Sequence, residues 1–293
     1  MLEWRVRSNT HANYKPSLGI GRSMALALDA NGASKVFVIG RREDKLKDVA
    51  SEAINGSIIP IVGDITCKNS LQSAYEQVAA QTDYIDLLVP NSGVIGPPAG
   101  PKQGEISLSQ LQNYLLDVPM EEFSDVFKVN VTGTFYSAVT FLPLLDAANS
   151  RRPPPVAGVL ATPRPQIIIV SSIAGFLRVG LTGYAYHSSK AATNMLIKML
   201  SSVLTKHNIR VNGIAPGPYY SEMSAEFYQK GGILGQGISD DSFPRTIVPL
   251  GRAGSTEDIA GMILWMAGAA GGYLNGSIIV SDGGRLGANP SSY

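Results

Sequence analysis

Residues 166–190 read QIIIVSSIAGFLRVGLTGYAYHSSK, with a strand pattern, a serine pair and a helix pattern in succession. The run 167–170 is continuously apolar, which is typical of a strand buried on both faces of a parallel sheet. Tyr186 and Lys190 are four positions apart at the start of a helical pattern, so phenol and ammonium share one helix face. Ser171-Ser172 follows the strand and can meet them across a cleft. The stretch predicts a proton-transfer site.

Similar strand patterns occur before and after this stretch and alternate with helical ones. We expect strands at 35–39, 57–62, 86–89, 166–170, 209–214 and 277–280. We expect helices at 20–31, 42–54, 69–81, 108–116, 123–147, 184–206 and 256–269. The alternation predicts an α/β fold, a doubly wound parallel sheet with helices on both faces.

Two segments interrupt this alternation in informative ways. Residues 150–165 hold five prolines and are expected to form a Pro-rich surface insertion. Residues 219–252 combine aromatic residues with glycines, which favours a substrate lid, although an ordinary solvent loop explains the glycines equally well. We expect residues 1–293 to form a single dinucleotide-binding domain.

Composition excludes several classes of function. The 24 basic and 23 acidic residues give a net charge of +1, which offers no electrostatic footprint for nucleic acid. A single cysteine excludes an intrachain disulfide framework, and three scattered histidines indicate no metal site. No run of about 18 apolar residues predicts a membrane span, and residues 1–16 lack a signal-peptide core. We therefore expect a cytoplasmic protein that acts on a small molecule.

Closely spaced glycines, Gly19-Ile20-Gly21, begin the first expected helix. There they allow backbone N–H groups to approach a pyrophosphate, although a simple turn is the alternative. The next strand leads into Arg41-Arg42, and arginine pairs with a 2′-phosphate where an acidic residue would prefer the free hydroxyl. This favours NADP over NAD; the alternative is a basic helix start.

Polar and small residues also follow the next two expected strands. Asp64 can accept a hydrogen bond from an adenine amino group while Ile65 flanks the ring, and an N-cap role for Asp64 is the alternative. Asn91-Ser92-Gly93 consists of small residues that let the backbone come close to a ligand. Strand ends of this kind bind ligands in doubly wound folds.

Taken together, the motifs resemble the ordered signature of the classical short-chain dehydrogenase/reductase family, and order and spacing match from about residue 18 to 286. The matching residues are Gly19-Ile20-Gly21, Gly40-Arg41-Arg42, Asp64-Ile65, Asn91-Ser92-Gly93, Asn130, Ser172, Tyr186-x-x-x-Lys190, Asn212, Pro216-Gly217 and Asp282-Gly283-Gly284. The resemblance implies a Rossmann-like fold and a nicotinamide cofactor.

The resemblance also implies catalytic roles. Tyr186 would be the general acid in reduction and the base in oxidation, and Lys190 would hold the nicotinamide ribose and lower the pKa of Tyr186. Ser172, rather than Ser171, would hydrogen-bond the substrate carbonyl oxygen. Asn130 would help hold a water relay to the lysine; on its own it would be a polar residue in a helix kink.

For the cofactor NADP(H), the resemblance implies contacts beyond the catalytic residues. Ser221 falls where the family often has a threonine that bonds the nicotinamide carboxamide. The full expected set is Gly19, Ile20, Gly21, Arg41, Asp64, Ile65, Asn91, Gly93, Tyr186, Lys190, Pro216, Gly217 and Ser221.

The N-terminus departs from the family pattern. The family begins with an apolar strand, central in the sheet, followed by Thr-Gly; here Tyr14 and Lys15 occupy those positions. Residues 6–13 are polar, and Leu2, Trp4 and Val6 alternate as an exposed strand would. The first strand is therefore expected to be atypical or missing. Either the N-terminus is an incorrect or truncated start, or a real divergence weakens cofactor binding.

The sequence thus predicts an NADP-dependent oxidoreductase that reversibly reduces a ketone to a secondary alcohol. The expected pocket is apolar and suits a hydrophobic small molecule, with Val94, Ile95, Pro97, Pro98, Phe176, Leu177 and Tyr184 as lining residues. The Pro-rich insertion resembles those of fungal tailoring reductases, which suggests secondary metabolism. The alternatives are a cofactor-binding regulatory or scaffold protein without turnover, and an epimerase or dehydratase.

The resemblance further implies a homodimer or homotetramer that forms through the helix carrying Tyr186. Residues Ala191, Ala192, Met195 and Met199 of that helix serve either this interface or the core.

Overall fold

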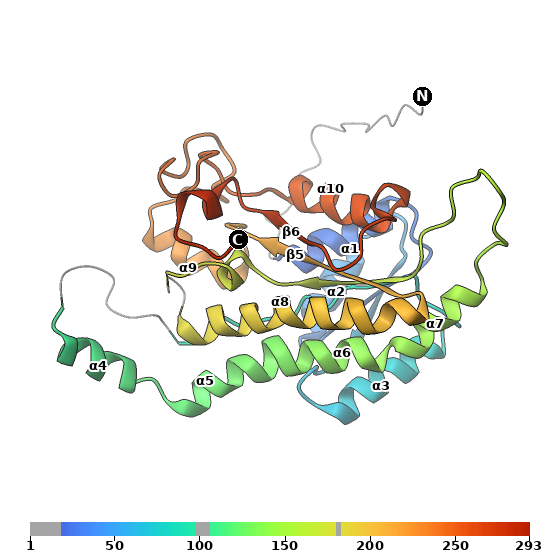
Figure 1. The fold of residues 1–293 in the computed structure, drawn as a ribbon, viewed down its shortest axis with the longest axis horizontal. Helices are drawn as coiled ribbons and strands as arrows, with labels where there is room; N and C mark the ends of the chain where they lie inside the picture. The colour runs from blue at the N-terminus through green and yellow to red at the C-terminus, as the bar shows by residue number, and fades with distance from the viewer. Residues whose placement is uncertain (1–18, 98–105, 180–182) are drawn as a thin grey trace.

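The computed structural model describes residues 19–97, 106–179 and 183–293 (Figure 1). Its strands are β1 (Val36–Gly40), β2 (Ile58–Val62), β3 (Leu87–Leu88), β4 (Gln166–Val170), β5 (Arg210–Pro216) and β6 (Ile278–Ser281). Its helices are α1 (Ile20–Ala30), α2 (Glu43–Ser51), α3 (Lys68–Ala79), α4 (Leu108–Leu116), α5 (Met120–Phe127), α6 (Thr134–Thr140), α7 (Leu142–Ser150), α8 (Tyr184–Leu204), α9 (Glu222–Lys230) and α10 (Thr256–Ala267).

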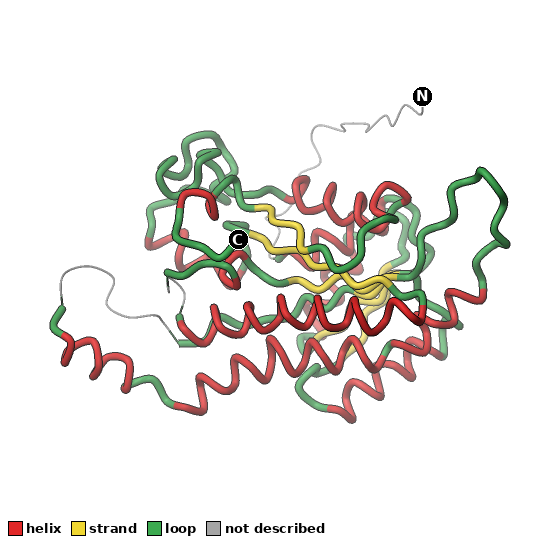
Figure 2. Tube along the Cα trace, in the orientation of Figure 1, coloured by secondary structure: helices red, strands yellow, loops and turns green. Residues whose placement is uncertain are grey.

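The strands lie between two layers of helices, as the alternation predicted (Figure 2). Within β4, Ile167 and Ile169 join the core beneath α6, α7 and α8, whereas Ile168 and Val170 join the core beneath α1 and α10. Successive side chains of a strand point to opposite faces, so both faces of β4 are covered. Every paired strand is parallel to its neighbour. The doubly wound α/β prediction is confirmed.

The sheet is split at one position. β1 pairs with β2, and β3, β4, β5 and β6 form a second sheet in that order. The five residues of β1 are only partly buried, although the sequence predicted a buried strand. Ile39 of β1 and Leu88 of β3 pack on the same core cluster, so the two sheets share one layer. Within the described ranges, the facing edges of β1 and β3 have no strand between them.

This break agrees with the expectation that the first strand is atypical or missing. The positions on which that expectation rested, Leu2, Trp4, Val6, Tyr14 and Lys15, lie outside the described residues. A strand at the interior edge of a sheet gains backbone hydrogen bonds and burial from both neighbours. Among the described residues, β1 pairs with β2 alone, and its five residues are partly buried.

The helix expected at 123–147 is interrupted twice. A π-helical turn, Lys128–Gly133, joins α5 to α6, and π-turns of this kind are frequent at functional sites. A second break falls at Phe141, just before Pro143 in the first turn of α7. Proline lacks a backbone N–H and tolerates only a first helical turn, so a new helix begins there.

The two irregular segments differ from each other. Residues 151–164 are mostly exposed and project from the body after α7 (Figure 1). Residues 219–252 contain α9, which the sequence did not predict. Within and just after this segment, a small separate core forms from Tyr228, Phe243, Val248 and Ala253. Among the helices described here, none has the length and apolar character needed to cross a membrane.

Candidate active site

The residues expected at the site follow the carboxyl ends of five strands. Because paired strands are parallel, their carboxyl ends lie at a common edge of each sheet. The residues at this edge are Arg41 after β1, Asp64 after β2, Asn91 and Gly93 after β3, Ser172 after β4 and Gly217 after β5.

Tyr186, in the opening turn of α8, faces Ser172, just after β4, closely enough for the Ser172 hydroxyl to influence the ionisation of the phenol. The Ser172 hydroxyl also accepts a hydrogen bond of 3.1 Å from the backbone N–H of Ala174, which fixes it at the start of a short 3₁₀ turn. The Ser171 hydroxyl donates instead to Asn194 Oδ1, at 2.6 Å. The serine that faces the phenol is therefore Ser172.

Lys190 is buried below the phenol, with only 4% of its surface exposed. Its Nζ lies 5.9 Å from the Tyr186 ring centroid and donates a hydrogen bond of 3.1 Å to the carbonyl oxygen of Val170. A Cβ placed on Gly93 would lie 3.4 Å from this Nζ, so the loop after β3 passes close to the ammonium. Burial lowers the pKa of Lys190 to about 8.

The pKa of Tyr186 shifts opposite to the expected direction. Burial raises the pKa, and the hydrogen bond with Ser172 lowers it by a smaller amount. The expectation that the Lys190 ammonium lowers the phenol pKa is therefore wrong for the protein without cofactor. The physical reason is that desolvation of a phenolate outweighs the attraction of an ammonium that is already hydrogen-bonded to Val170.

Asn130 lies in the π-helical turn and is fully buried. Its side-chain amide donates to Ser189 Oγ at 2.9 Å and to the carbonyl oxygen of Val94 at 3.0 Å, while Oδ1 accepts from the Val94 N–H at 2.8 Å. Its backbone carbonyl accepts a hydrogen bond from Thr193 Oγ1. Asn130 therefore joins the loop after β3 to α8. Its place in the π-helical turn agrees with the interpretation as a kink residue, and its role in a water relay stays a prediction.

The amino end of α1 fits a phosphate group. Gly19 is its N-cap at φ 151°, no side chain caps the helix, and a Cβ there would meet nothing within 4 Å. Without a side-chain cap, the first-turn N–H groups at the positive end of the helix dipole are suited to an anion. Ile20 packs against the core cluster beneath α1 and α10. A Cβ on Gly21 would lie 2.5 Å from Asn91 Nδ2. A side chain at position 21 would force the Asn91 amide to move.

Arg41 and Asp64 follow the neighbouring parallel strands β1 and β2. Arg41 acts electrostatically on Asp64 and helps to lower its pKa, although hydrogen bonds from Thr66 are the larger cause. Asp64 Oδ1 accepts from both the N–H and the hydroxyl of Thr66, at 2.8 and 2.7 Å. Cys67, and not Asp64, is the N-cap of α3, so the helix-cap alternative for Asp64 is wrong.

Ile65 packs against the π-helical turn, because a Cβ on Gly133 would lie 2.7 Å from Ile65 Cδ1. Pro216, the last residue of β5, is buried like the rest of the strand. A Cβ on Gly217 would lie 2.6 Å from Asp282 Cβ. Glycine at 217 is thus needed for the close approach of the ends of β5 and β6. Ser221 caps α9, accepting a hydrogen bond from Ser224 N–H at 3.3 Å.

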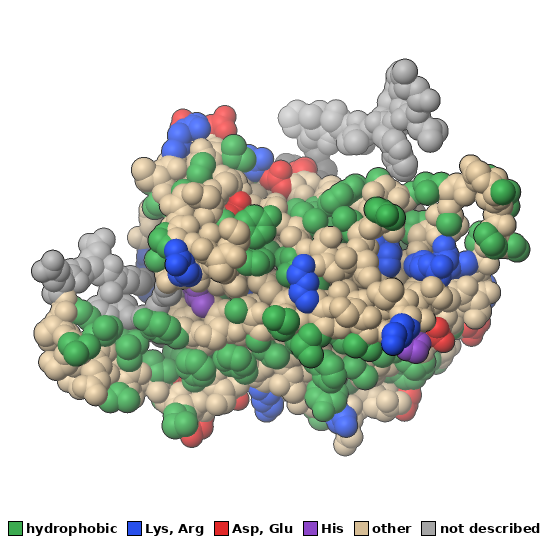
Figure 3. Space-filling view, in the orientation of Figure 1, with side chains coloured by type: hydrophobic (Ala, Val, Ile, Leu, Met, Phe, Trp, Pro, Cys, Tyr) green, Lys and Arg blue, Asp and Glu red, His purple; other side chains and the backbone are tan. Residues whose placement is uncertain are grey.

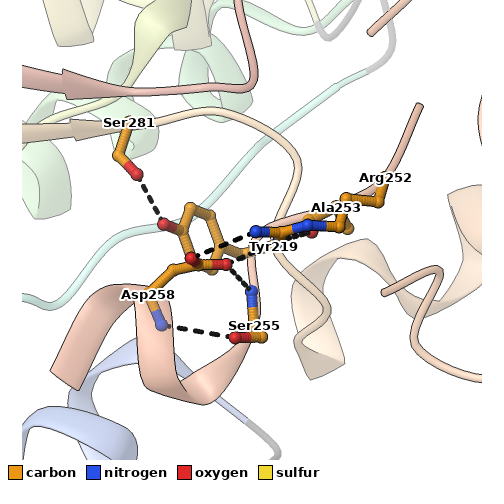
Figure 4. A network of polar contacts seen from close by, with 6 residues as sticks. All are labelled: Tyr219, Arg252, Ala253, Ser255, Asp258 and Ser281. Atoms are coloured by element: carbon orange, nitrogen blue, oxygen red, sulfur yellow. Dashed lines mark hydrogen bonds and ion pairs between the residues drawn. The ribbon is translucent and has the colours of Figure 1, made fainter. Parts of the chain in front are cut away.

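A polar network ties the ends of residues 219–252, the segment expected to form a lid, to β6 and α10 (Figure 4). Tyr219 is hydrogen-bonded through its hydroxyl to Ser281 Oγ at 2.6 Å. Arg252 makes two contacts with the Asp258 carboxylate, at 2.6 and 3.2 Å, and Asp258 also accepts from the N–H of Ser255 at 2.7 Å. The network fixes both ends of residues 219–252 on β6 and α10.

Sequence reasoning missed the polar groups that support the site from α8. Ser189, Thr193 and Asn194 are buried and bond Asn130 or Ser171. Their spacing from Tyr186 and Lys190 is three or four residues, and this polar stripe was the signal that would have identified them. The apolar pattern of this helix left open which residues face the core and which face an interface.

The comparisons agree with this geometry. A family model described as short chain dehydrogenase matches residues 16–231. "Short-chain dehydrogenase/reductase PhomF" of Diaporthe leptostromiformis is 43% identical over 276 residues, covering 94% of this chain and 90% of the relative. "Short-chain dehydrogenase/reductase SAT3" of Stachybotrys chartarum is 36% identical over 277 residues, covering 92% and 100%.

A solved structure also resembles the fold. The RhlG/NADP active-site complex of Pseudomonas aeruginosa superposes with a TM-score of 0.71 at 27% identity, covering 91% of this chain and 92% of that chain. Family model, fungal relatives and fold agree over most of the chain. The chain belongs to the classical short-chain dehydrogenase/reductase family of oxidoreductases.

Proposed function

We propose that this protein catalyses the reversible, NADP-dependent reduction of a ketone to a secondary alcohol on a hydrophobic small molecule. One observation carries the proposal: the buried Lys190 Nζ lies 5.9 Å from the centroid of the Tyr186 ring, and Ser172 faces the same phenol. A buried ammonium is costly to keep in a folded protein and is found where chemistry needs it.

In this proposal Tyr186 gives its phenolic proton to the substrate oxygen in reduction and takes it back in oxidation. The Ser172 hydroxyl donates a hydrogen bond to the same oxygen as negative charge develops there. Lys190, held by Val170, returns a proton toward Tyr186 and holds the ribose of the cofactor, and Asn130 fixes the loop and helix that border it. A bound nicotinamide cofactor supplies the hydride.

The residues proposed to hold NADP(H) fit that molecule. The uncapped end of α1 at Gly19 to Gly21 would take the pyrophosphate, Arg41 and Arg42 the 2′-phosphate, and Asp64 and Ile65 the adenine. Asn91, Gly93, Pro216, Gly217 and Ser221, with Tyr186 and Lys190, would surround the nicotinamide riboside. The NADP complex of the solved relative supports the choice of cofactor.

The proposed substrate is hydrophobic because the segment that follows Ser172 carries the apolar residues Phe176 and Leu177. The rings of Phe176 and Tyr293 pack edge to face with centroids 5.2 Å apart, and the carbonyl of Leu177 faces His187. The aromatic core of the lid lies in residues 219–252. The relatives from Diaporthe leptostromiformis and Stachybotrys chartarum support secondary metabolism as the proposed setting. We propose the cytoplasm as the compartment.

We also propose that the protein is a homodimer or homotetramer that associates through α8. Met195, Met199 and Val203 are 59%, 58% and 61% exposed, so they do not serve the core. Hydrophobic side chains gather along α8 and the helices beside it (Figure 3). A contiguous exposed apolar face of this kind marks an interface, and a second copy would bury it.

The test is NADPH consumption on a panel of ketones, with Tyr186→Phe and Tyr273→Phe compared with the wild type. Tyr273 is fully exposed and serves as the matched control. We expect Tyr186→Phe to retain NADPH binding and to lose about 10²- to 10⁴-fold in turnover, and Tyr273→Phe to lose nothing. Equal turnover by Tyr186→Phe and wild type on every reduced ketone would overturn the proposal.

The split between β1 and β3 favours one other function, a cofactor-binding scaffold without turnover. A nucleotide that binds in stoichiometric amount, with no ketone of the panel reduced, would support the scaffold. Turnover on any ketone that depends on Tyr186 excludes it.

A further inference from the structure

Arg42 and Glu222 form an ion pair across the nucleotide edge of the site. Arg42 follows β1 and is the N-cap of α2, and Glu222 is the first residue of α9. A guanidinium nitrogen of Arg42 lies 2.6 Å from Glu222 Oε2, although the two residues are 180 positions apart. The pair therefore ties the lid segment to the end of β1.

Local helix structure does not explain the position of Arg42. The amino end of a helix dipole disfavours a cation, and the Arg42 side chain makes no cap hydrogen bond to α2. The neighbouring Arg41 acts on Asp64, on the other side of the same loop. Each arginine at the end of β1 therefore has an acidic partner from a different element, and the partner of Arg42 comes from the lid.

A 2′-phosphate at this position would compete with Glu222. A phosphate carries more charge than a carboxylate and has more acceptor oxygens, so a guanidinium binds it more strongly. The Glu222 carboxylate and the phosphate would repel each other at this short range. The pair is also solvent-exposed, with side-chain exposures of 63% and 38%, and exposed pairs separate at low cost.

We propose that Glu222 is a specificity-determining residue for the cofactor, an internal anion that holds Arg42 until a 2′-phosphate displaces it. This inference rests on the proposed NADP-dependent function. Displacement frees α9 from the end of β1, and Ser221, which caps α9 and is expected near the nicotinamide, belongs to the same turn. A nucleotide without the 2′-phosphate leaves the Arg42–Glu222 pair in place, so the lid responds to the kind of cofactor bound.

The binding test compares adenosine 2′,5′-bisphosphate with adenosine 5′-monophosphate on the wild type, Glu222→Gln and Glu226→Gln. Glu226 lies one turn further along α9 and is ion-paired with Lys230, so it controls for a general change of charge. We expect Glu222→Gln to bind the bisphosphate about two- to fivefold more tightly, the range of an exposed ion pair. The 5′-monophosphate and the Glu226→Gln variant should show no change.

Two further measurements isolate the pair. In an Arg42→Gln background, Glu222→Gln should no longer change affinity for the bisphosphate, as a double-mutant cycle requires. In the wild type, amide hydrogen exchange of residues 222–230 should rise on adding the bisphosphate and not the 5′-monophosphate. An equal gain in affinity from Glu222→Gln and Glu226→Gln, or unchanged exchange in α9, overturns the inference and leaves the proposed function standing.

The failure of the proposed function looks different. If neither nucleotide binds the wild type or any variant, the NADP site itself is wrong, and the role of Glu222 falls with it.

Discussion

Replacing Lys190 with methionine should stabilise the protein near neutral pH while removing its activity. Lys190 is 4% exposed, and burial lowers its pKa from 10.5 to about 8. A shift of that size corresponds to about 3 kcal/mol of destabilisation of the charged form. Methionine fills similar space without charge but loses the hydrogen bond to Val170, which costs about 1–2 kcal/mol. The expected net gain is about 1–2 kcal/mol at about pH 7.

The pH dependence of this gain has a definite sign. Between about pH 8 and pH 10.5 the unfolded chain keeps Lys190 protonated while the folded chain has released the proton. The unfolded state then binds more protons, so this group makes the wild type more stable as pH rises through that window. Lys190→Met lacks the rise, so its advantage should shrink by about 2 kcal/mol between about pH 7 and about pH 9.5.

Urea unfolding without cofactor, followed by circular dichroism at both pH values, measures the effect. Lys198→Met is the matched control, since Lys198 lies on the same helix with its side chain exposed. Lys198→Met should not reproduce the increase in the free energy of unfolding that is expected of Lys190→Met. The reasoning is refuted if Lys190→Met is less stable than the wild type at about pH 7, or if the difference between them does not vary with pH.

Three further outcomes are expected. Replacing residues 1–15 with an apolar strand followed by Thr-Gly should tighten NADPH binding by about tenfold or more in a fluorescence titration, since one added hydrogen bond to a charged group contributes about 1.5 kcal/mol; no gain would contradict the expectation that Tyr14 and Lys15 in place of Thr-Gly weaken cofactor binding. Met199→Glu should lower the mass measured by light scattering, because it places charge on the exposed face of α8; an unchanged mass would exclude this interface. Ser255→Ala should lower the free energy of unfolding by about 1 kcal/mol in urea, because Ser255 caps α10; no loss would mean that the cap contributes nothing.

The central strands and the motifs at their ends could be predicted from the sequence. The continuous apolar run of Ile167–Val170 identifies β4 because both faces of this strand are covered by helices. Parallel strands place their carboxyl ends together, so the sequence predicts that side chains at strand ends, such as Ser172, lie close to one another even when no contacts are known.

Contacts between distant segments could not be predicted. The sequence pattern made Met195 and Met199 candidates for the core, whereas the inward face of α8 holds Thr193 and Asn194, which are needed to bond Asn130 and Ser171. A periodic pattern reports that a helix has two faces but does not say which face a polar site requires.

Helix α9 and its ion pair were missed for a related reason. The position of Ser221 after Pro216-Gly217 predicts a cofactor contact, whereas in the structure Ser221 is the N-cap of α9. A serine at the start of a helix is a local sequence signal for such a cap. The pairing of Glu222 with Arg42 joins residues 180 positions apart, and only the folded chain brings them together.

Transfer of deuterium tests the proposed chemistry most directly. The protein is incubated with a ketone from the panel and NADPH deuterated at C4 of the nicotinamide, on each face in turn, and the product is analysed by mass spectrometry. We predict one deuterium on the carbinol carbon of the alcohol, from one face of the cofactor only, with wild type and not with Tyr186→Phe. Binding of NADPH without deuterium in any alcohol would contradict the account.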